Sequence, residues 1–119
     1  MRILIIEDDR ATARLYSDWL AKAGHDIRVV GTGSDALANV VSWKPEGVLL
    51  DLILPDMPGM EVLFHIRRQM PDVRVIACTN GFIPALVETA IANGAAHVFD
   101  KSILSAQDLA LKFDEIARR

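Results

Sequence analysis

Several apolar segments of this sequence end in side chains that can take part in chemistry. Asp51 ends the apolar run 48–50, and an ionised carboxylate at the end of a buried strand is costly unless a cation or hydrogen-bond donors compensate it. Other apolar segments end beside further polar residues, which are Glu7, Asp8 and Asp9 after 2–6, Thr79 after 73–78 and Lys101 after 96–99. If these residues lie together in the folded chain, they can compensate Asp51.

The residue types in this set suit a phosphoryl group. Three carboxylates in one cleft repel one another, and Mg²⁺ relieves that repulsion because it binds one or two carboxylates and keeps water and phosphate oxygens as its other ligands. Lys101 adds a positive charge and Thr79 adds a hydroxyl group. The set therefore predicts a site for a phosphoryl group that is carried by, or attacked by, Asp51.

Turn residues and helix caps divide the chain into five predicted strands and five predicted helices. Thr32 with Asp35, and Ser105 with Asp108, resemble capping boxes, and Gly24 stands where the first helix should end. The predicted strands are 2–6, 26–30, 47–51, 73–78 and 96–99. The predicted helices are 10–23, 32–43, 60–70, 84–93 and one that starts after Ser105. The residues of the first helix expected to face inward are Ala11, Leu15, Trp19, Leu20 and Ala23.

Buried strands that alternate with helices over short connections predict a parallel sheet with helices on both faces. We expect an α/β fold of three layers, a doubly wound (βα)5 arrangement with the strand order 2-1-3-4-5. Ligands of such sheets bind at the carboxyl ends of the strands, where the strand order reverses. In this order the reversal lies between the strand that ends at Glu7 and Asp8 and the strand that ends at Asp51.

Composition narrows the class of protein. The 119 residues are 51% hydrophobic and 24% charged, which is typical of a folded chain, and we expect one domain over 1–119. The net charge of −3 argues against direct binding of nucleic acid, because phosphate contacts need a basic surface. The one cysteine, Cys78, excludes an intramolecular disulfide and a multi-cysteine metal site. Without a signal peptide or a stretch apolar enough to span a membrane, the chain is expected to be cytoplasmic and not to enter the membrane.

Four features follow one another along the chain, namely the segments ILIIEDD at 3–9 and LLDLILPDMPGMEVL at 49–63, the residue Thr79, and the segment GAAHVFDKS at 94–102. Taken together, they resemble the response regulator receiver domain, the CheY-like phosphoacceptor module of two-component signalling. The resemblance covers essentially the whole chain and implies the flavodoxin-like strand order given above. Each feature alone is weak, but all four at these spacings are specific.

The resemblance implies a role for each polar residue of the metal site. Asp51 would be the phosphoacceptor, and Mg²⁺ or Mn²⁺ would be the cofactor. Asp8 would bind the metal directly and Glu7 would bind it through water, while the backbone carbonyl of Ile53 would supply a further ligand.

The resemblance also implies how phosphorylation would be transmitted. Lys101 would pair with the phosphoryl oxygens and Thr79 would move toward them, so that the phosphoryl group favours one of two conformations. Such a domain phosphorylates itself and is not a turnover enzyme. Ile53 and Gly81 occupy the two positions that tune phosphoryl lifetime in the family.

The implied partners are proteins. The phosphoryl donor would be a sensor histidine kinase or a histidine phosphotransfer protein, with small acyl phosphates as substitutes. The output would be a downstream target or an attached output domain, contacted through the helix 84–93, the strand 96–99 and the last helix, and the same face could form a homodimer. The apolar residues expected on that face are Phe82, Ile83, Leu86 and Leu111.

The chain departs from the family pattern at several positions. Val98 stands where an aromatic residue usually precedes the lysine, and Phe99 is expected on the opposite face of its strand. Ser102 replaces a proline that is often preceded by a cis bond, so a trans peptide is expected here. Asn80 replaces a small residue and is expected to narrow access to Asp51.

Other functions stay open at this point. A degenerate receiver could keep the fold as a phosphorylation-independent interaction module. A phosphatase of the haloacid dehalogenase type also uses an aspartyl nucleophile, but it needs a second aspartate where this chain has Ile53. A flavodoxin-like cofactor carrier would need hydroxyl groups where three acids follow the first strand. The segment GTGSDA at 31–36 matches a dinucleotide-binding pattern, but it follows the predicted edge strand and is interpreted as a turn and helix cap.

Overall fold

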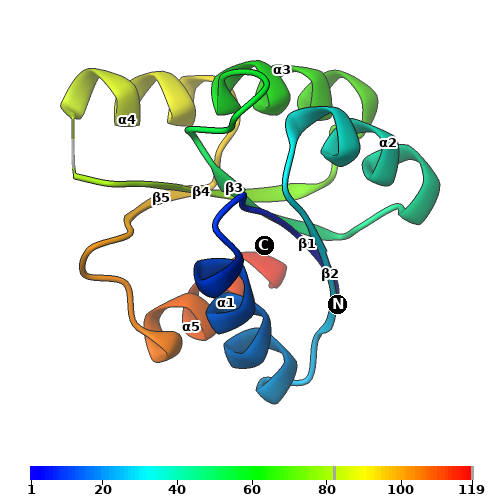
Figure 1. The fold of residues 1–119 in the computed structure, drawn as a ribbon, viewed down its shortest axis with the longest axis vertical. Coiled ribbons are helices and arrows are strands. Elements are labelled where there is room, and N and C mark those ends of the chain that lie inside the picture. The colour runs from blue at the N-terminus through cyan, green and yellow to red at the C-terminus, as the bar shows by residue number, and fades with distance from the viewer. Residues whose placement is uncertain (82, 119) are drawn as a thin grey trace.

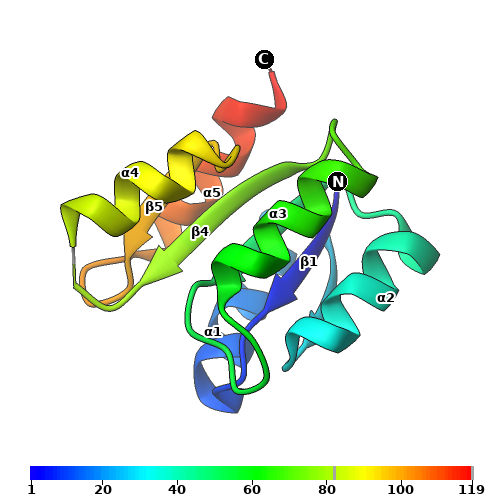
Figure 2. The ribbon, with the colours of Figure 1, turned by 90° about the horizontal axis from the view of Figure 1, so that it is seen from above.

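Five parallel strands form one sheet in the order β2-β1-β3-β4-β5, which confirms the predicted topology (Figure 1). The structure, a computed structural model, describes residues 1–81 and 83–118. The strand bounds are β1 Arg2–Ile6, β2 Asp26–Val30, β3 Gly47–Asp51, β4 Arg74–Thr79 and β5 His97–Asp100. Viewed from above, the arrows of β1, β4 and β5 point to the same edge of the sheet (Figure 2), and β2 and β3 pair parallel with these strands. All carboxyl ends therefore meet there.

Five helices cover the two faces of the sheet. Their bounds are α1 Arg10–Lys22, α2 Gly33–Trp43, α3 Gly59–Gln69, α4 Pro84–Ala92 and α5 Ala106–Ala117. Figure 1 shows α2, α3 and α4 on one face and α1 and α5 on the other, so the three predicted layers are present. Within the described ranges, the chain contains no helix with the length and apolar character needed to cross a membrane.

The core consists of one apolar layer on each side of the sheet. In β3, the side chains of Val48 and Leu50 enter the layer beneath α2, α3 and α4, while Leu49 enters the layer that faces α1 and α5. All five residues of β3 are buried, because helices cover both of its faces. The strand that carries Asp51 is therefore the most enclosed part of the sheet.

Local sequence signals place the helix ends correctly. The Thr32 side chain accepts a hydrogen bond from the Asp35 amide at 3.0 Å, and the Ser105 side chain accepts one from the Asp108 amide at 3.1 Å. Gly24 adopts a positive φ of 94° after α1, where a residue without a Cβ is favoured. The predicted caps are thus confirmed, and the helix ends agree with prediction or differ from it by one residue.

The predicted inner face of α1 was partly wrong. Leu20 is buried as expected and Trp19 packs partly buried against the core, but Leu15 is 46% exposed. The face follows the spacing of three and four residues that runs through Tyr16, whose ring is apolar although its hydroxyl is polar. The buried residues of α1 are Ala13, Tyr16 and Leu20, whereas Ala11 and Leu15 in the helix and Ala23 just after it are exposed.

Candidate functional site

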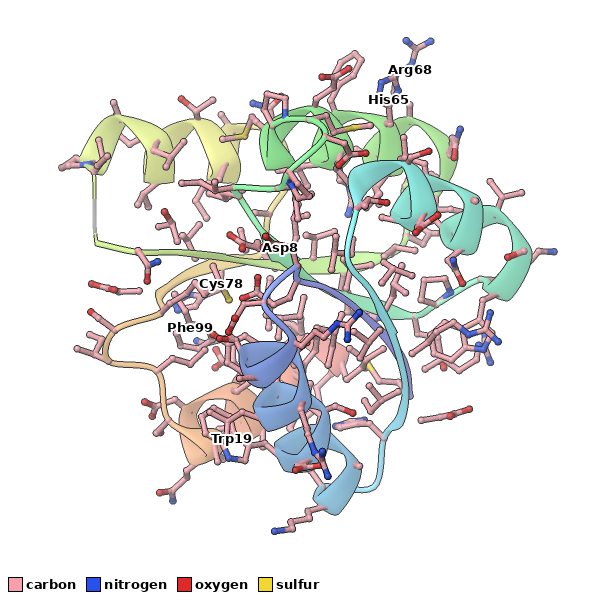
Figure 3. The ribbon with its side chains drawn as sticks, viewed as in Figure 1. Asp8, Trp19, His65, Arg68, Cys78 and Phe99 are labelled. Atoms are coloured by element: carbon pink, nitrogen blue, oxygen red, sulfur yellow. The ribbon has the colours of Figure 1, made fainter. Side chains whose placement is uncertain are left out.

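Three carboxylates gather at the carboxyl edge of the sheet. One oxygen from each of Glu7, Asp8 and Asp51 can be chosen so that all three lie within 4.8 Å of one another. The strand register explains this, because Ile6 in β1 pairs with Leu50 in β3, and the acids follow directly. Figure 3 shows Asp8 where β1 passes into α1. The predicted convergence of the two strand ends is present.

These acids open into a hollow of about 320 Å³. Glu7 is only 3% exposed and Asp51 8% exposed, whereas Asp8 is exposed to solvent. Ile53, Asn80 and Lys101 also line the hollow. A small anion can therefore reach Asp51 from solvent, and Asn80 stands at the side of that approach, as its position in the sequence predicted.

Lys101 bridges the two buried carboxylates. Its Nζ donates to Asp51 Oδ2 at 3.3 Å and also to Glu7 Oε1. Burial lowers the pKa of Lys101, but the hydrogen bond to Glu7 and the charges of Asp51 and Glu7 outweigh that effect, so its pKa is raised. The side chain stays positively charged and compensates part of the acidic charge.

Glu7 binds a proton more tightly than an exposed glutamate does. Burial, followed by the hydrogen bond and the charge of Asp51, raises the pKa of Glu7 to about 7, and Lys101 opposes the shift. One lysine does not neutralise the cluster of acids. The site therefore carries excess negative charge, which a bound proton or a divalent cation can neutralise.

The loop after β3 holds the carboxylate of Asp51 in place. The Ile53 amide donates to Asp51 Oδ1 at 3.0 Å, and Ile53 forms an isolated antiparallel bridge with Pro58. The Gly59 amide donates to the Leu52 carbonyl at 2.9 Å, which closes the base of the loop. A Cβ on Gly59 would lie 2.5 Å from the Asp51 carbonyl oxygen, so the close approach requires glycine.

Thr79 lies near the site but does not line the hollow. It ends β4, is 2% exposed, and accepts a hydrogen bond at its carbonyl from the Lys101 amide at 2.8 Å. Strand alternation places its side chain on the same face as Ala77, which pairs with Val98 in β5. The predicted hydroxyl therefore belongs to a buried residue at the carboxyl end of β4, whose backbone is bonded to that of Lys101.

The predicted differences around β5 are confirmed. Val98 packs in the layer beneath α4, whereas Phe99 packs in the opposite layer (Figure 3). The described residues contain no cis peptide bond, so the bond before Ser102 is trans. The non-aromatic Val98 thus lies beside β4, where it pairs with Ala77.

Three further acids surround the site without belonging to the cluster. Asp9 caps α1 by accepting from the Thr12 amide at 3.0 Å, and it directly precedes the predicted helix 10–23. Asp100 accepts from the Gly81 amide at 3.2 Å and from the Ser102 amide at 3.0 Å, so it ties together the loops that follow β4 and β5. The third, Asp56, reaches α2.

Neither Asp56 nor Asp100 was predicted to take part in the site. Asp56 lies in the loop between β3 and α3 and Asp100 ends β5, and aspartates in or beside turns commonly accept from backbone amides. The sequence therefore indicates that each carboxylate could accept from backbone amides, but it does not show which amides donate to it. The partner amides lie 23 and 19 positions away along the chain.

Comparison with known families decides the class of this domain. The sequence profile of the response regulator receiver domain matches residues 3–113. This chain belongs to the response regulator receiver domain family.

Regulatory proteins are among the curated relatives of this receiver domain. It is 41% identical over 92 residues to the regulatory protein LuxO of Vibrio cholerae, a match that covers 76% of this chain and 20% of that protein. It is 44% identical over 85 residues to the luminescence regulatory protein LuxO of Vibrio campbellii, covering 71% of this chain and 19% of that protein. The receiver domain thus spans about one fifth of these relatives.

Solved receiver domains share the whole fold. The signal receiver domain of a LuxO repressor from Vibrio parahaemolyticus superimposes with a TM-score of 0.90 at 32% identity, covering 96% of this chain and 87% of that one. A CheY-like receiver domain from Methanospirillum hungatei gives a TM-score of 0.91 at 27% identity, covering 97% of this chain and 91% of that one. The predicted family and fold are therefore confirmed.

The dinucleotide-like segment of the receiver domain is a turn and a helix cap. At the start of α2, the amides of Gly33 and Ser34 donate to Asp56 at 2.8 and 3.0 Å, and the amide of Asp35 donates to Thr32. A dinucleotide would place its pyrophosphate on these amides. Because side chains of the protein already accept from them, the interpretation as a cap holds.

Proposed function

We propose that this chain is a phosphorylation-controlled switch in which Asp51 accepts a phosphoryl group in a reaction that depends on Mg²⁺ or Mn²⁺. The observation that carries the proposal is the meeting of Glu7, Asp8, Asp51 and Lys101 at one hollow that opens to solvent. The proposal extends to the setting of the domain, which is one receiver domain over 1–119 that works in the cytoplasm.

The donor atoms around Asp51 fit a hard divalent cation. Carboxylate and carbonyl oxygens are the ligands that Mg²⁺ takes, and Asp8 and Asp51 would bind it directly, Glu7 through water, and Ile53 through its backbone carbonyl. The bound metal would neutralise the acids and the oxygens of an incoming phosphoryl group. Oxygen ligands alone are therefore sufficient to bind this cation.

The chain's own groups orient the acceptor. The Ile53 amide holds Oδ1 of Asp51 at 3.0 Å, and Lys101 contacts Oδ2 at 3.3 Å, so the carboxylate is held at both oxygens. In the transfer, a carboxylate oxygen forms the new P–O bond as the P–N bond of a phosphohistidine breaks, and the imidazole leaves with the electron pair. Lys101 then faces the charge of the phosphoryl oxygens.

The switch would use Lys101 and Thr79 together. Moving a two-state equilibrium from 1:99 to 99:1 takes about 5.5 kcal/mol. A charge-assisted hydrogen bond contributes roughly 1.5 to 3 kcal/mol, so a single new contact is insufficient. The backbone bond that joins the Lys101 amide to the Thr79 carbonyl supports a coupled movement of the two.

The proposed partners follow from the family. A sensor histidine kinase or a histidine phosphotransfer protein would supply the phosphoryl group, and a downstream protein, an output domain or a second copy would contact α4, β5 and α5. On that face Ile83 is 60% and Leu111 58% exposed, and Leu86 is partly buried. Phe82, also predicted there, lies outside the described residues. A related domain, the receiver of Klebsiella pneumoniae RstA at 25% identity, is described as BeF3-activated.

The activity is best described as signalling and not as turnover. The aspartyl phosphatase alternative needs a second acid two positions after Asp51, and the side chain there is Ile53, which is 69% exposed and carries no acid or base. A degenerate receiver would keep the same fold and bind partners without accepting phosphate. The following experiment separates it from the proposal.

The test is incubation of the chain with Mg²⁺ and a small acyl phosphate, followed by intact mass measurement. We expect one added phosphoryl group, no addition when a chelator removes the metal, and no addition to Asp51→Asn. Asp72→Asn serves as a matched control, since it removes an equivalent charge from an exposed turn before β4 and should still be phosphorylated. A chain that gains no mass, or an Asp51→Asn variant that gains the same mass, overturns the proposal.

A further inference from the structure

The tip of the loop between β3 and α3 is fastened to a helix that is distant in sequence. Asp56 Oδ1 accepts from the Gly33 amide at 2.8 Å and Oδ2 accepts from the Ser34 amide at 3.0 Å. These two backbone bonds hold the pKa of Asp56 below its usual range. Figure 2 shows the loop before α3 beside the first turn of α2. Both oxygens of one carboxylate are therefore committed to the start of α2.

A second residue of the loop docks at the same place. A Cβ on Gly33 would lie 2.6 Å from Cγ of Met57 and 2.9 Å from Cγ2 of Val62. The Met57 side chain thus fills the space that a larger residue at 33 would take. Asp56 and Met57, which are neighbours in the loop, both contact Gly33, the first residue of α2. Because one contact is polar and the other apolar, the loop docks here specifically.

The base of the same loop is joined to the acceptor. Ile53 donates its amide to Asp51 and forms a bridge with Pro58, while Gly59 donates to Leu52. Between these bonds and the contact at Asp56, the loop is held at both its base and its tip. Ile53, whose carbonyl is proposed as a metal ligand, lies within this doubly held segment.

We infer that Asp56 is a positioning residue for the metal site, acting through the loop that carries Ile53. The inference rests on the proposed function. A ligand supplied by a loop binds a cation well only when the loop is already in place, and groups that orient ligands commonly change metal affinity by about 10- to 100-fold when they are removed. Asp56 fixes the loop from its tip, so its loss frees the segment around one of several ligands.

The test compares Mg²⁺ affinities of folded variants. Mg²⁺ is titrated into the full chain while the amide resonances of Ile53 and Asp51 are followed by NMR, and urea unfolding is measured without metal. For Asp56→Ala we expect a dissociation constant raised about three- to tenfold, less than for loss of a ligand-orienting group because one ligand among several is affected. Asp56→Asn keeps one acceptor oxygen and should fall between Asp56→Ala and the parent.

Asp35→Ala is the matched control. Asp35 carries the same charge as Asp56 and lies in the first turn of α2, which Asp56 contacts. It takes part in the cap through its backbone amide, which donates to Thr32. Its loss should lower helix stability to a similar degree and leave Mg²⁺ affinity unchanged.

The outcomes separate the two proposals. A parent chain that binds Mg²⁺ and an Asp56→Ala variant that binds it equally well would show that Asp56 is only a structural cap, which overturns this inference alone. An equal loss of affinity in Asp35→Ala overturns it as well, because the effect would then come from charge. A parent chain that binds no Mg²⁺ overturns the proposed function and this inference together.

Discussion

Glu7 and Asp51 both contact a single lysine, Lys101. One positive charge therefore faces two buried carboxylates, and this imbalance underlies the proposed binding of a cation. Both carboxylates are nearly excluded from water, and Lys101 contacts each of them. Buried like charges raise proton affinity, and here the rise appears as a pKa of about 7 for Glu7. A proton and a divalent cation would compete for this cluster.

The Glu7 shift predicts a pH-dependent stability in the metal-free protein. The folded-state pKa of about 7 lies above the ordinary value of 4.5, so the folded protein binds the proton more tightly than the unfolded chain. The stability that this gives is fully present below pH 4.5 and is lost as pH rises through 7. Glutamine at position 7 does not titrate, so the Glu7→Gln variant does not lose this stability. Between pH 5 and pH 8 its free energy of unfolding should therefore rise by roughly 2 kcal/mol relative to that of the parent.

Urea unfolding across this pH range, with a chelator present to remove metal, measures this difference in the free energy of unfolding. Glu88→Gln, which changes an exposed glutamate of α4, should follow the parent at every pH. A constant difference between Glu7→Gln and the parent would mean that Glu7 titrates normally and that the cluster does not need a further positive charge.

At the scale of the elements, the loop between β3 and α3 depends on backbone contact at Gly59. A Cβ there would lie 2.5 Å from both the Asp51 carbonyl oxygen and the Leu52 Cα, and backbone atoms of a buried strand end cannot move aside easily. Gly59→Ala should therefore lower the free energy of unfolding by about 2 kcal/mol or more. Differential scanning calorimetry or urea unfolding would measure the loss.

Gly31→Ala provides the comparison for Gly59. A Cβ on Gly31 would meet its nearest atom, the Asp8 Cα, at 3.8 Å, which is an ordinary contact. This variant should stay within about 0.5 kcal/mol of the parent. Equal losses in both variants would indicate a general cost of replacing glycine and would remove the argument for a tight loop.

The elements themselves were largely predictable, because their signals are local. The caps at Thr32 and Ser105 and the glycine at 24 mark helix ends within a few residues of sequence. The face of α1 was less predictable, since Tyr16 counts as polar in an apolar pattern yet is only 4% exposed. A local pattern cannot weigh a side chain that buries its ring against other elements.

The contacts that complete the site could not be predicted from sequence patterns. The proximity of Asp51 to Glu7 was predictable from the strand order, because that order is common to doubly wound parallel sheets. The contact of Asp56 with the start of α2 depends instead on the path of one loop, and it joins residues 23 positions apart. No propensity or spacing rule refers to such a pair.

At the scale of the whole molecule, the acceptor end and the proposed partner face are separate surfaces. The acids lie at the carboxyl edge of the sheet, while Leu111 lies on α5, one of the helices of the proposed partner face. If phosphorylation favours self-association through this face, Leu111→Ala should raise the dissociation constant of the dimer about fivefold, because an exposed apolar side chain there would be buried.

Sedimentation velocity in Mg²⁺ with a fluoroberyllate measures this association. Val41→Ala is the matched control, since Val41 on α2 is 56% exposed and Leu111 is 58% exposed. Equal dissociation constants for the two variants would place the interface elsewhere.

The most direct measurement for the whole account is a crystal structure of the chain grown with Mg²⁺ and a fluoroberyllate. The account predicts a cation bound by oxygens of Asp8, Asp51 and the Ile53 carbonyl, with beryllium on an oxygen of Asp51 and Lys101 turned from Glu7 toward the fluorines. A structure in which the cation binds elsewhere, or Asp51 stays paired only with Lys101, would contradict it.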